Sequence, residues 1–566
     1  MTRRITDSVK EQRGVVLVAT LLIMAVLLVQ GIAFLATAQT EDTIAGNFRN
    51  QTQTFYGAEA GLESGIVSLR NLLAATGNAT DAQLAALAAP ALTDPNYTFN
   101  TFQVQRIRPT PYATTVSSGA HVGLIAQATD YEITAEVRGP RGSRSRLTQV
   151  VQYLEIPLFQ FGVFYGRGVD LEIAPGPPMT FNGRVHANSN IYMINNTTKF
   201  DSYVTTVGDL HRYLKRDPTD HASNPQIKNA AGVYQSLNFD HEYDQNFNNP
   251  WTPLQWMNAA LSTFGGLLRD SAMGVQEIIP PVPDLFYDPA SPDVVAHEMI
   301  ERGTGADSPE MQAAKLYYQA DLRIEDSAGT AKDKNGNPVG LPAGVVTSKT
   351  FYDKREEADI QILEVDIGAL MASGKAPANG ILYVSHQGTN KGVRLVDGAQ
   401  LPAGGFTVVS ENPVYIQGNY NTVNKVPAAV LADAITVLSN NWGPNNSDAK
   451  GNQATSNRPA TNTTVNAAFA LGPDEESSVG QGNGQLENVI RFLEDWNGDT
   501  FTYNGSLIAL WHSLQADGNW RCCGDSGTNY YRPPNRVWAY DTLFNTSIPP
   551  GTPRGILIMK GRWSQA

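Results

Sequence analysis

The chain has almost no cysteine for its length of 566 residues. Its two cysteines, Cys522 and Cys523, are neighbours in the sequence, so they cannot link distant segments of the fold. A vicinal disulfide and two free thiols are both open interpretations. A metal site is disfavoured, because the pair has neither CxxC spacing nor a nearby histidine. Long-range disulfides are therefore excluded as a source of stability.

Basic residues are also in the minority. The chain has 41 lysines and arginines against 54 acidic residues, a formal net charge of −13, which argues against nucleic acid as a partner. The 50 glycines and 33 prolines indicate many turns and strands rather than a helical bundle. The length is sufficient for a core divided into two or three lobes.

Charge is absent altogether from residues 14–40, directly after a basic leader. At 1.5 Å per residue, the apolar residues 15–38 form a helix of about 36 Å, which exceeds a hydrocarbon core of about 30 Å. Basic residues outnumber acidic ones in the leader, residues 1–14: Arg3, Arg4, Lys10 and Arg13 against Asp7 and Glu11. This excess predicts that the leader is cytoplasmic and that the remainder of the chain lies outside.

Two interpretations of the apolar segment compete. Ala36-Thr37-Ala38 could serve a signal peptidase, which would release a protein that begins at Gln39. The apolar run is too long for an ordinary signal core, however, and its helical stripe continues beyond it. The members of that continuing stripe are Ile44, Phe48, Phe55, Leu62, Ile66, Leu69 and Leu73. We therefore predict one retained helix over residues 15–75, with residues 15–38 in the membrane.

A motif follows the apolar segment. It reads E-x-x-x-A-G-N-x-R-x-x-x-x-x-F-x-x-A-E-A-G-L, from Glu41 to Leu62. Together with the basic leader that ends in Gly14, it resembles the N-terminal region of PilX-type minor pilins of bacterial type IV pilus systems. The resemblance implies an inner-membrane protein that prepilin peptidase cleaves between Gly14 and Val15. It also implies methylation of the new N-terminus and helix packing with other major and minor pilins.

Ala19 departs from the pattern of most pilins. Those proteins carry glutamate five residues into the mature chain, where this sequence has Ala19. An apolar residue at that position resembles the initiating or tip subunits, such as the K-type pseudopilins of type II secretion. The departure favours a position at the end of a fibre over incorporation throughout it.

Three glycines lie at four-residue spacing in the predicted helix: Gly57, Gly61 and Gly65. Each costs about 1 kcal/mol of helix propensity relative to alanine, so we expect a packing gain that offsets this cost. Small residues at this spacing allow another backbone to come close. The partner is either a neighbouring subunit or the chain's own globular part, and the sequence favours neither.

The remainder of the chain predicts an α+β protein with a mainly β head. Alternating residues predict antiparallel strands over residues 95–160. Short strands separated by glycine and asparagine predict a right-handed β-solenoid-like head over residues 161–200 and 376–566, with a β-sandwich as the alternative. Segments such as GRVHANSNIY and LADAITVLSNNW also resemble long PilX-like proteins with extended C-terminal domains.

Residues 201–375 are interpreted as a helix-containing insertion in this head. A capping box, Thr252-Pro253-Leu254-Gln255, predicts a helix that continues to about residue 269. Ser308-Pro309 predicts a second helix that ends near residue 320. We expect both helices to lie in a lobe on the flank of the solenoid.

Candidate chemical sites are few. Asp495, Asn497 and Asp499 have the alternating oxygens that calcium prefers, but a turn is the favoured interpretation and no cofactor is predicted. His297 begins a zinc-protease-like HExxE segment that lacks the second histidine, so we expect a surface helix there. His186 is expected to be a structural histidine, and the GDSG sequence at residues 524–527 a polar turn.

Three functions follow, of which the first is favoured. The chain is predicted to be a non-enzymatic minor pilin that primes or caps a type IV pilus, displays a large head and contacts a tip adhesin. The first alternative is a minor pseudopilin of type II secretion, supported by Ala19. The second is a membrane-anchored β-solenoid enzyme that acts on polysaccharide. The sequence does not reveal the cluster of catalytic side chains that such an enzyme requires.

Overall fold

A computed structural model describes residues 3–76, 79–117, 123–219, 223–244, 247, 249–278, 292–327, 330–443, 450–474, 485–523 and 528–565. The chain divides into two units. Unit 1 comprises Met1–Tyr112, Ala128–Leu154 and Leu557–Ala566. Unit 2 comprises Ala113–Gln127 and Glu155–Ile556.

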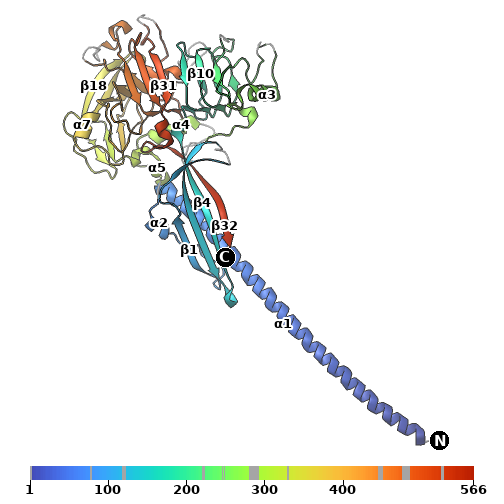
Figure 1. The fold of residues 1–566 in the computed structure, drawn as a ribbon. Helices are drawn as coiled ribbons and strands as arrows, with labels where there is room; N and C mark the ends of the chain where they lie inside the picture. The colour runs from blue at the N-terminus through green and yellow to red at the C-terminus, as the bar shows by residue number, and fades with distance from the viewer. Residues whose placement is uncertain are drawn as a thin grey trace. The chain divides into compact units, whose positions relative to one another are not determined.

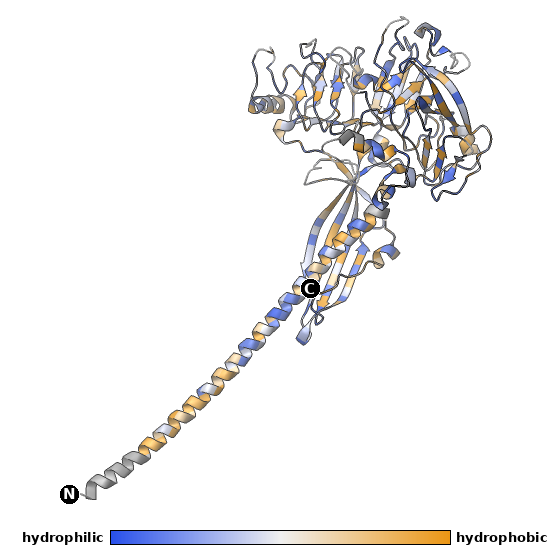
Figure 2. Cartoon of the chain, turned by 180° about the vertical axis from the view of Figure 1, so that it is seen from behind, coloured by the Kyte–Doolittle hydropathy of each residue, from blue (hydrophilic) through white to orange (hydrophobic). Residues whose placement is uncertain are grey.

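Unit 1 begins with α1, a single helix that runs from Arg3 to Thr76 (Figure 1). The long N-terminal helix predicted from the sequence is therefore confirmed. In the coloured part of this helix, hydrophobic residues come first and polar residues follow them (Figure 2). The described part of this helix from Val15 onward is long and apolar enough to cross a membrane, with a mean hydropathy of 2.8 in its most apolar window.

An antiparallel sheet completes unit 1. Its order is β1-β3-β4-β32, and β2 pairs with β3. Before the sheet comes a short helix, α2 (Asp81–Ala85). The strands are β1 (Thr98–Arg106), β2 (Tyr112–Thr115), β3 (Ile125–Arg138), β4 (Arg144–Pro157) and β32 (Arg554–Gln565). β1 and β3 are antiparallel, with Phe102 opposite Ala135. The chain therefore leaves this sheet after β4 and returns to it only at its last strand.

This return corrects a predicted boundary. The sequence pattern assigns residues 376–566 entirely to the head, but β32 is a strand of the unit 1 sheet and the neighbour of β4. The sequence does not reveal this pairing, because the partner strand is separated from β32 by most of the chain.

The core of unit 1 is the contact between α1 and the sheet. Buried side chains of the helix recur every three or four residues and form one apolar face. They are Ala58, Leu62, Ile66, Leu69 and Leu73, and they pack with Ile133, Ala135 and Val137 of β3 in one cluster. Only the C-terminal part of α1 has this cover.

Unit 2 contains a stack of coils built from short strands. One eleven-stranded sheet has the order β15-β11-β8-β5-β30-β27-β24-β22-β20-β16-β17. Its strands are β15 (Leu268–Arg269), β11 (Val204–Thr206), β8 (Val185–Ala187), β5 (Val163–Tyr165), β30 (Leu507–Ala509), β27 (Ala468–Ala470), β24 (Ala428–Ala432), β22 (Phe406–Ser410), β20 (Ile381–Ser385), β16 (Leu322–Glu325) and β17 (Lys332–Asp333). All neighbours in this sheet are parallel except β16 and β17.

Four further sheets supply the other sides of the coils. Two of these sheets belong to the C-terminal half. One consists of β18 (Val346–Asp353), β19 (Ala358–Asp366), β21 (Lys391–Val396), β23 (Val414–Gln417), β25 (Ile435–Leu438) and β28 (Ile490–Phe492). The other consists of β26 (Thr463–Asn466), β29 (Thr500–Gly505) and β31 (Asn535–Tyr540). The other two sheets belong to the N-terminal half. One consists of β12 (Leu210–His211), β9 (Ile191–Met193) and β6 (Leu171–Ile173). The other consists of β14 (Tyr234–Ser236), β13 (Gln226–Lys228), β10 (Thr198–Phe200) and β7 (Met179–Phe181). We call the strands from β5 to β15 and from β16 to β31 the coil stack.

The chain enters the coil stack in its middle. β5, the first strand of the stack in the sequence, pairs in parallel with β30, so that Phe164 lies opposite Ile508. The N-terminal coils extend from β5 to β15 at one end of the eleven-stranded sheet, and the C-terminal coils extend from β16 back to β30. The parallel ladders contradict the β-sandwich alternative, whose sheets are antiparallel. The right-handed sense of the winding stays a prediction.

The predicted insertion is also corrected. Residues 201–375 include strands β11 to β15 and β16 to β19, which belong to the same sheets as the predicted head. Strands β11 to β15 have only two or three residues, too few to show the alternation by which a strand is recognised, which explains the error for that part of the range. The helices in and near this range are α3 (Pro253–Phe264), α4 (Pro292–His297), α5 (Pro309–Ala314), α6 (Leu316–Gln319) and α7 (Ile367–Ala372).

The predicted capping box of α3 is confirmed. The Gln255 backbone N–H donates to Thr252 Oγ1 at 3.3 Å, and the Thr252 backbone N–H donates to Gln255 Oε1 at 2.9 Å. The helix ends at Phe264, earlier than predicted, because Gly265 follows it in the left-handed region with φ of 64°.

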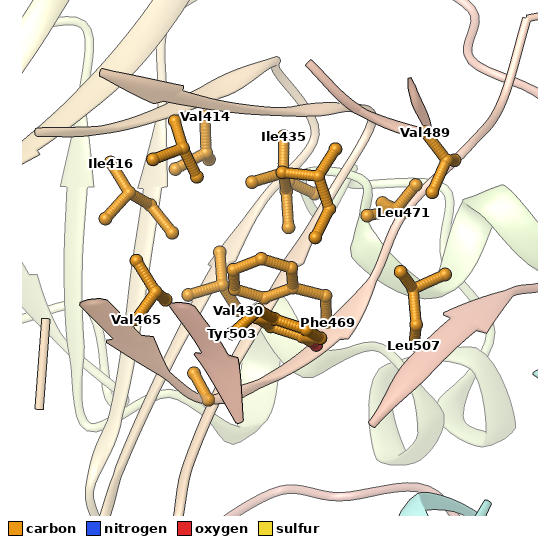
Figure 3. Close-up of a cluster of buried hydrophobic side chains, with 14 of the residues drawn as sticks. Val414, Ile416, Val430, Ile435, Val465, Phe469, Leu471, Val489, Tyr503 and Leu507 are labelled. Atoms are coloured by element: carbon orange, nitrogen blue, oxygen red, sulfur yellow. The ribbon is translucent and has the colours of Figure 1, made fainter. Parts of the chain in front are cut away.

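Apolar side chains fill the interior of the coils. Figure 3 shows them converging from the sheets of the C-terminal half. Val414 and Ile435 come from one sheet, and Phe469 and Leu507 come from the eleven-stranded sheet. All are almost completely buried. The coil interior is therefore a dry, packed core rather than a channel.

Candidate functional site

The apolar stretch of α1 that begins at Val15 is not covered by other parts of the described chain. Every large apolar side chain that the structure describes from Val15 to Leu35 is at least half exposed, and Phe34 reaches 76%. A surface of this length and composition requires lipid or other apolar helices as its surroundings. Gly14 and Val15 both lie inside α1. Cleavage between them stays a prediction.

Gly57, Gly61 and Gly65 of α1 face the chain's own sheet. A Cβ at Gly61 would lie 2.6 Å from Phe99 Cε1 and 2.9 Å from Ala135 Cβ. At Gly65 it would lie 2.8 Å from Ile133 Cγ2, and at Gly57 it would lie 3.3 Å from Val137 Cγ1. The two alternatives of the sequence were a neighbouring subunit and the chain's own globular part. The structure places this face against the second of them.

Gly61→Leu is expected to destabilise the contact between α1 and β3 by about 1–3 kcal/mol, because the added side chain overpacks a closed interface. Faster hydrogen exchange of the β3 amides would report this loss. Gly31→Leu is the matched control, since a Cβ at Gly31 meets nothing within 4 Å. Equal exchange in the two variants would show that Gly61 is not a packing position.

Other apolar side chains beyond the predicted membrane span have no cover. Ile44 and Phe48 continue the stripe of buried positions but lie N-terminal to the part that the sheet covers, with exposures of 62% and 74%. Tyr56 and Val67 are also more than half exposed. Sequence spacing predicted Ile44 and Phe48 as members of one stripe, but it could not show where the sheet ends. These residues are candidates for contact with a partner helix.

The residues of the PilX-like motif divide between these two surfaces. Ala58 and Leu62 are buried against the sheet, whereas Glu41, Arg49 and Glu59 are exposed. Packing within the chain explains the first group. Packing within the chain does not explain the three charged residues, which lie on the same helix as the exposed apolar side chains.

The calcium candidates form a turn. The Asn497 backbone N–H donates to Asp495 Oδ1 at 3.1 Å, and Arg532 Nη1 lies 3.2 Å from Asp495 Oδ2. The Asp499 backbone N–H donates to the carbonyl of Trp496 at 2.9 Å. This is the hydrogen-bonded turn that the sequence favours, and calcium binding there stays a minor alternative.

The sulfur atoms of Cys522 and Cys523 lie against each other, which is compatible with the vicinal-disulfide interpretation of the pair. They line a cavity of about 340 Å³ together with Glu487, Trp520 and Arg536. Burial raises the pKa of the Glu487 carboxyl to about 7. The GDSG sequence at residues 524–527 lies outside the described residues.

His186 occupies the structural role that the sequence predicts. Its Nδ1 lies 2.8 Å from Thr205 Oγ1, and its Nε2 lies 2.9 Å from Asn188 Oδ1. Burial lowers the pKa of this imidazole to about 4, against a smaller opposing effect of the hydrogen bond with Asn188. His186 is therefore neutral at physiological pH.

His297 differs from its prediction as a surface residue. It is 2% exposed at the end of α4, where Nδ1 lies 3.1 Å from Glu301 Oε1 and Nε2 lies 3.1 Å from Asp433 Oδ1. Burial lowers its pKa, but the hydrogen bonds with the two carboxylates outweigh burial and raise the pKa to about 9. The sequence could not predict this site, because Asp433 comes from a distant coil.

Unit 2 is expected to lose stability as the pH rises from about 7 to 10. The folded pKa of His297 exceeds its ordinary value of about 6.5, so the stabilisation is complete below pH 6.5 and disappears as the pH passes 9. The shift corresponds to about 3 kcal/mol. His297→Gln should therefore cost most at pH 6 and little at pH 10 in urea unfolding. A difference independent of pH would contradict this assignment.

Comparisons with known proteins add one weak likeness. No protein-family model matches the chain, and no curated protein matches it significantly. Among solved structures, the competence-associated pilin ComZ from Thermus thermophilus is similar at 12% sequence identity. The alignment covers 91% of this chain and 98% of that chain, with a TM-score of 0.28, which is below the level that indicates a shared fold.

Proposed function

We propose that this chain is a structural, non-enzymatic minor subunit of a type IV pilus. The observation that carries the proposal is the exposed apolar surface of α1 from Val15 to Leu35, on a helix whose C-terminal part packs one face against its own sheet. A helix of this kind is stable in lipid before assembly and among similar helices afterwards. The motif from Glu41 to Leu62, which resembles PilX-type minor pilins, supports the same proposal.

The proposed location follows from the helix and its leader. α1 anchors the chain in the bacterial inner membrane through residues 15–38, with the leader in the cytoplasm and the remainder of the chain outside, until assembly moves the chain into a pilus. The proposed partners are prepilin peptidase, other major and minor pilins and a tip adhesin. The net charge of −13 disfavours nucleic acid.

A terminal position in the fibre is favoured by the size of unit 2 and by Ala19. Unit 2 holds most of the residues of the chain, so copies of it conflict sterically with one another at the close spacing of bulk subunits. Ala19 also removes the carboxylate that usually neutralises the N-terminal amine of a buried mature helix. At the tip, or in the complex that initiates the fibre, neither the size of unit 2 nor the missing carboxylate at Ala19 interferes with assembly.

A minor pseudopilin of type II secretion is the second candidate, because Ala19 resembles the K-type pseudopilins. Both candidates require the same membrane anchor and the same processing. The neighbouring genes distinguish them, since a pilus cluster with a large adhesin supports the first and a set of secretion genes supports the second.

Processing provides the direct test. In wild type, mass spectrometry of the mature protein is expected to find N-methyl-Val15 at the N-terminus. Gly14→Leu should leave the full-length precursor in the membrane, because the residue before the scissile bond is then too large for the peptidase. A bulky substitution at Gly31, which lies in the span but away from the cleavage site, is the control. A mature protein that begins at Gln39 would overturn the pilin assignment.

A further inference from the structure

Two acidic side chains and a histidine meet at the far end of the N-terminal coils. Asp209 directly precedes β12, the last strand of its three-stranded sheet, and Asp270 directly follows β15, the last strand of the eleven-stranded sheet. His241 lies between them in the sequence, after β14. One ligand atom from each of the three residues lies within 4.8 Å of the others.

Backbone hydrogen bonds hold the three segments in place. The His241 N–H donates to the carbonyl of Leu210 at 3.1 Å, and the Ser271 N–H donates to the carbonyl of Gly208 at 3.0 Å. Both neighbours of Asp209 therefore accept bonds from the segments that carry the other two side chains. The cluster is organised by the fold and does not depend on the side chains alone.

The three side chains converge on one another, and the Ser271 hydroxyl also donates to Asp209 Oδ1 at 2.6 Å. His241 Nδ1 lies 2.5 Å from Asp270 Oδ2 and 3.5 Å from Asp209 Oδ1. The Asp270 side chain is fully buried, and its other oxygen accepts the Ala272 N–H at 3.0 Å. Asp209 is 42% exposed, so the position is open to solvent on one side.

The charges at this position favour a cation. Within the described part of the chain, neither carboxylate forms an ion pair with a lysine or arginine. Two carboxylates at this separation repel each other, one of them in a fully buried location, and a single imidazole compensates at most one charge. A divalent ion would offset both.

We propose that Asp209, His241 and Asp270 bind a divalent transition-metal ion, for which zinc is the appropriate probe. One imidazole nitrogen and two carboxylate oxygens form a ligand set that zinc accepts at about 2.0–2.2 Å, with water at the remaining position. Calcium and magnesium are disfavoured because they prefer sites built from oxygen alone. The ion displaces the proton of His241 Nδ1, so binding weakens at acidic pH.

The bound ion joins the last strands of two sheets to the loop after β14. The end of a parallel stack is its weakest part, because the outermost strands pair on one side only. A metal that ties Asp209, His241 and Asp270 together closes this end. The ion is therefore structural, and its loss loosens the terminal coils without affecting the C-terminal half.

The test uses the full chain in detergent micelles after removal of metals with EDTA. Calorimetric titration with zinc chloride is expected to show one high-affinity ion per chain, and cobalt is expected to give d–d absorption bands of a four- or five-coordinate site. Asp209→Asn and His241→Gln should each weaken zinc binding at least tenfold. Glu242→Gln, a carboxylate next to His241 but outside the cluster, should leave it unchanged.

Three results would overturn the proposal: no zinc binding by the wild-type chain, equal zinc affinity in wild type and His241→Gln, or calcium binding as tight as zinc at this position. Asp209→Asn distinguishes a loss of zinc binding from misfolding, because Asp209 is partly exposed and its substitution should not disturb the fold. Its unfolding midpoint without metal should equal that of wild type, and only the increase on addition of zinc should disappear.

Discussion

Asp474→Asn is expected to lower the stability of unit 2 by about 3–5 kcal/mol, because it leaves two buried arginines with too little compensating charge. Asp474 pairs with Arg355 through one carboxylate oxygen and with Arg491 through the other. All three side chains are less than a tenth exposed. The amide of asparagine would also direct N–H donors at guanidinium groups, which accept none.

The surrounding contacts explain why these arginines cannot move to solvent. Arg355 Nε donates to the carbonyl of Gly518 at 2.9 Å, and Arg491 Nη1 lies 2.6 Å from Glu356 Oε1. The network therefore joins the loop after β18 to the C-terminal coils, and its loss should loosen both. Urea unfolding followed by tryptophan fluorescence measures the change.

Glu357→Gln is the matched control. Its ion pair with Arg521 is exposed, with side-chain exposures of 67% and 47%, and a pair of this kind contributes at most about 1 kcal/mol. An equal loss of stability in Asp474→Asn and Glu357→Gln would show that burial does not determine how much the Asp474 network contributes to the stability of unit 2.

A chain in which a short loop replaces residues 158–553 is expected to fold as unit 1, remain in the membrane and be processed. It should nevertheless fail to restore pilus initiation or surface adhesion in a null strain. β4 and β32 are neighbours in the sheet, and the Leu158 N–H lies 3.4 Å from the carbonyl oxygen of Pro553. A loop of about two to five residues can therefore close the gap.

This design separates the role of the head from the stability of the anchor. Simple truncation after β4 would also remove β32 and expose an edge of the unit 1 sheet. Full-length chain expressed at the same level is the positive control, and immunoblots of membranes and sheared pili show where each protein is found. Normal piliation and adhesion with the shortened chain would contradict the proposed role of unit 2.

The sequence predicted the features that depend on local composition. The uncharged run before Glu41 and the spacing of Leu62, Ile66 and Leu69 were sufficient for the long helix, since both signals are contained within a few turns. The partner of β32 was not predictable, because a pairing between strands far apart in the sequence produces no local pattern. The N-terminal coils were not recognised in full, because strands of two or three residues show no periodicity.

The same distinction applies to the candidate sites. The glycine spacing in α1 predicted close packing, but only the structure could identify Phe99 and Ala135 as the partners of Gly61. Asp209, His241 and Asp270 are spaced about thirty residues apart and match no metal-binding motif. They meet because successive coils return their loops to the same end of the coil stack, which a linear pattern cannot express.

Entry of the chain at the middle of the coil stack has a consequence for biosynthesis. During export to the proposed location outside the membrane, the coils from β5 to β15 emerge first, and the strand that completes their inner edge, β30, emerges near the end. Until then β5 presents an unpaired parallel edge, which can associate with other chains. Closure of the seam also requires contacts of very high sequence separation, which form slowly. Nascent or prematurely terminated chains should therefore depend on chaperones outside the membrane, whereas completed chains should not.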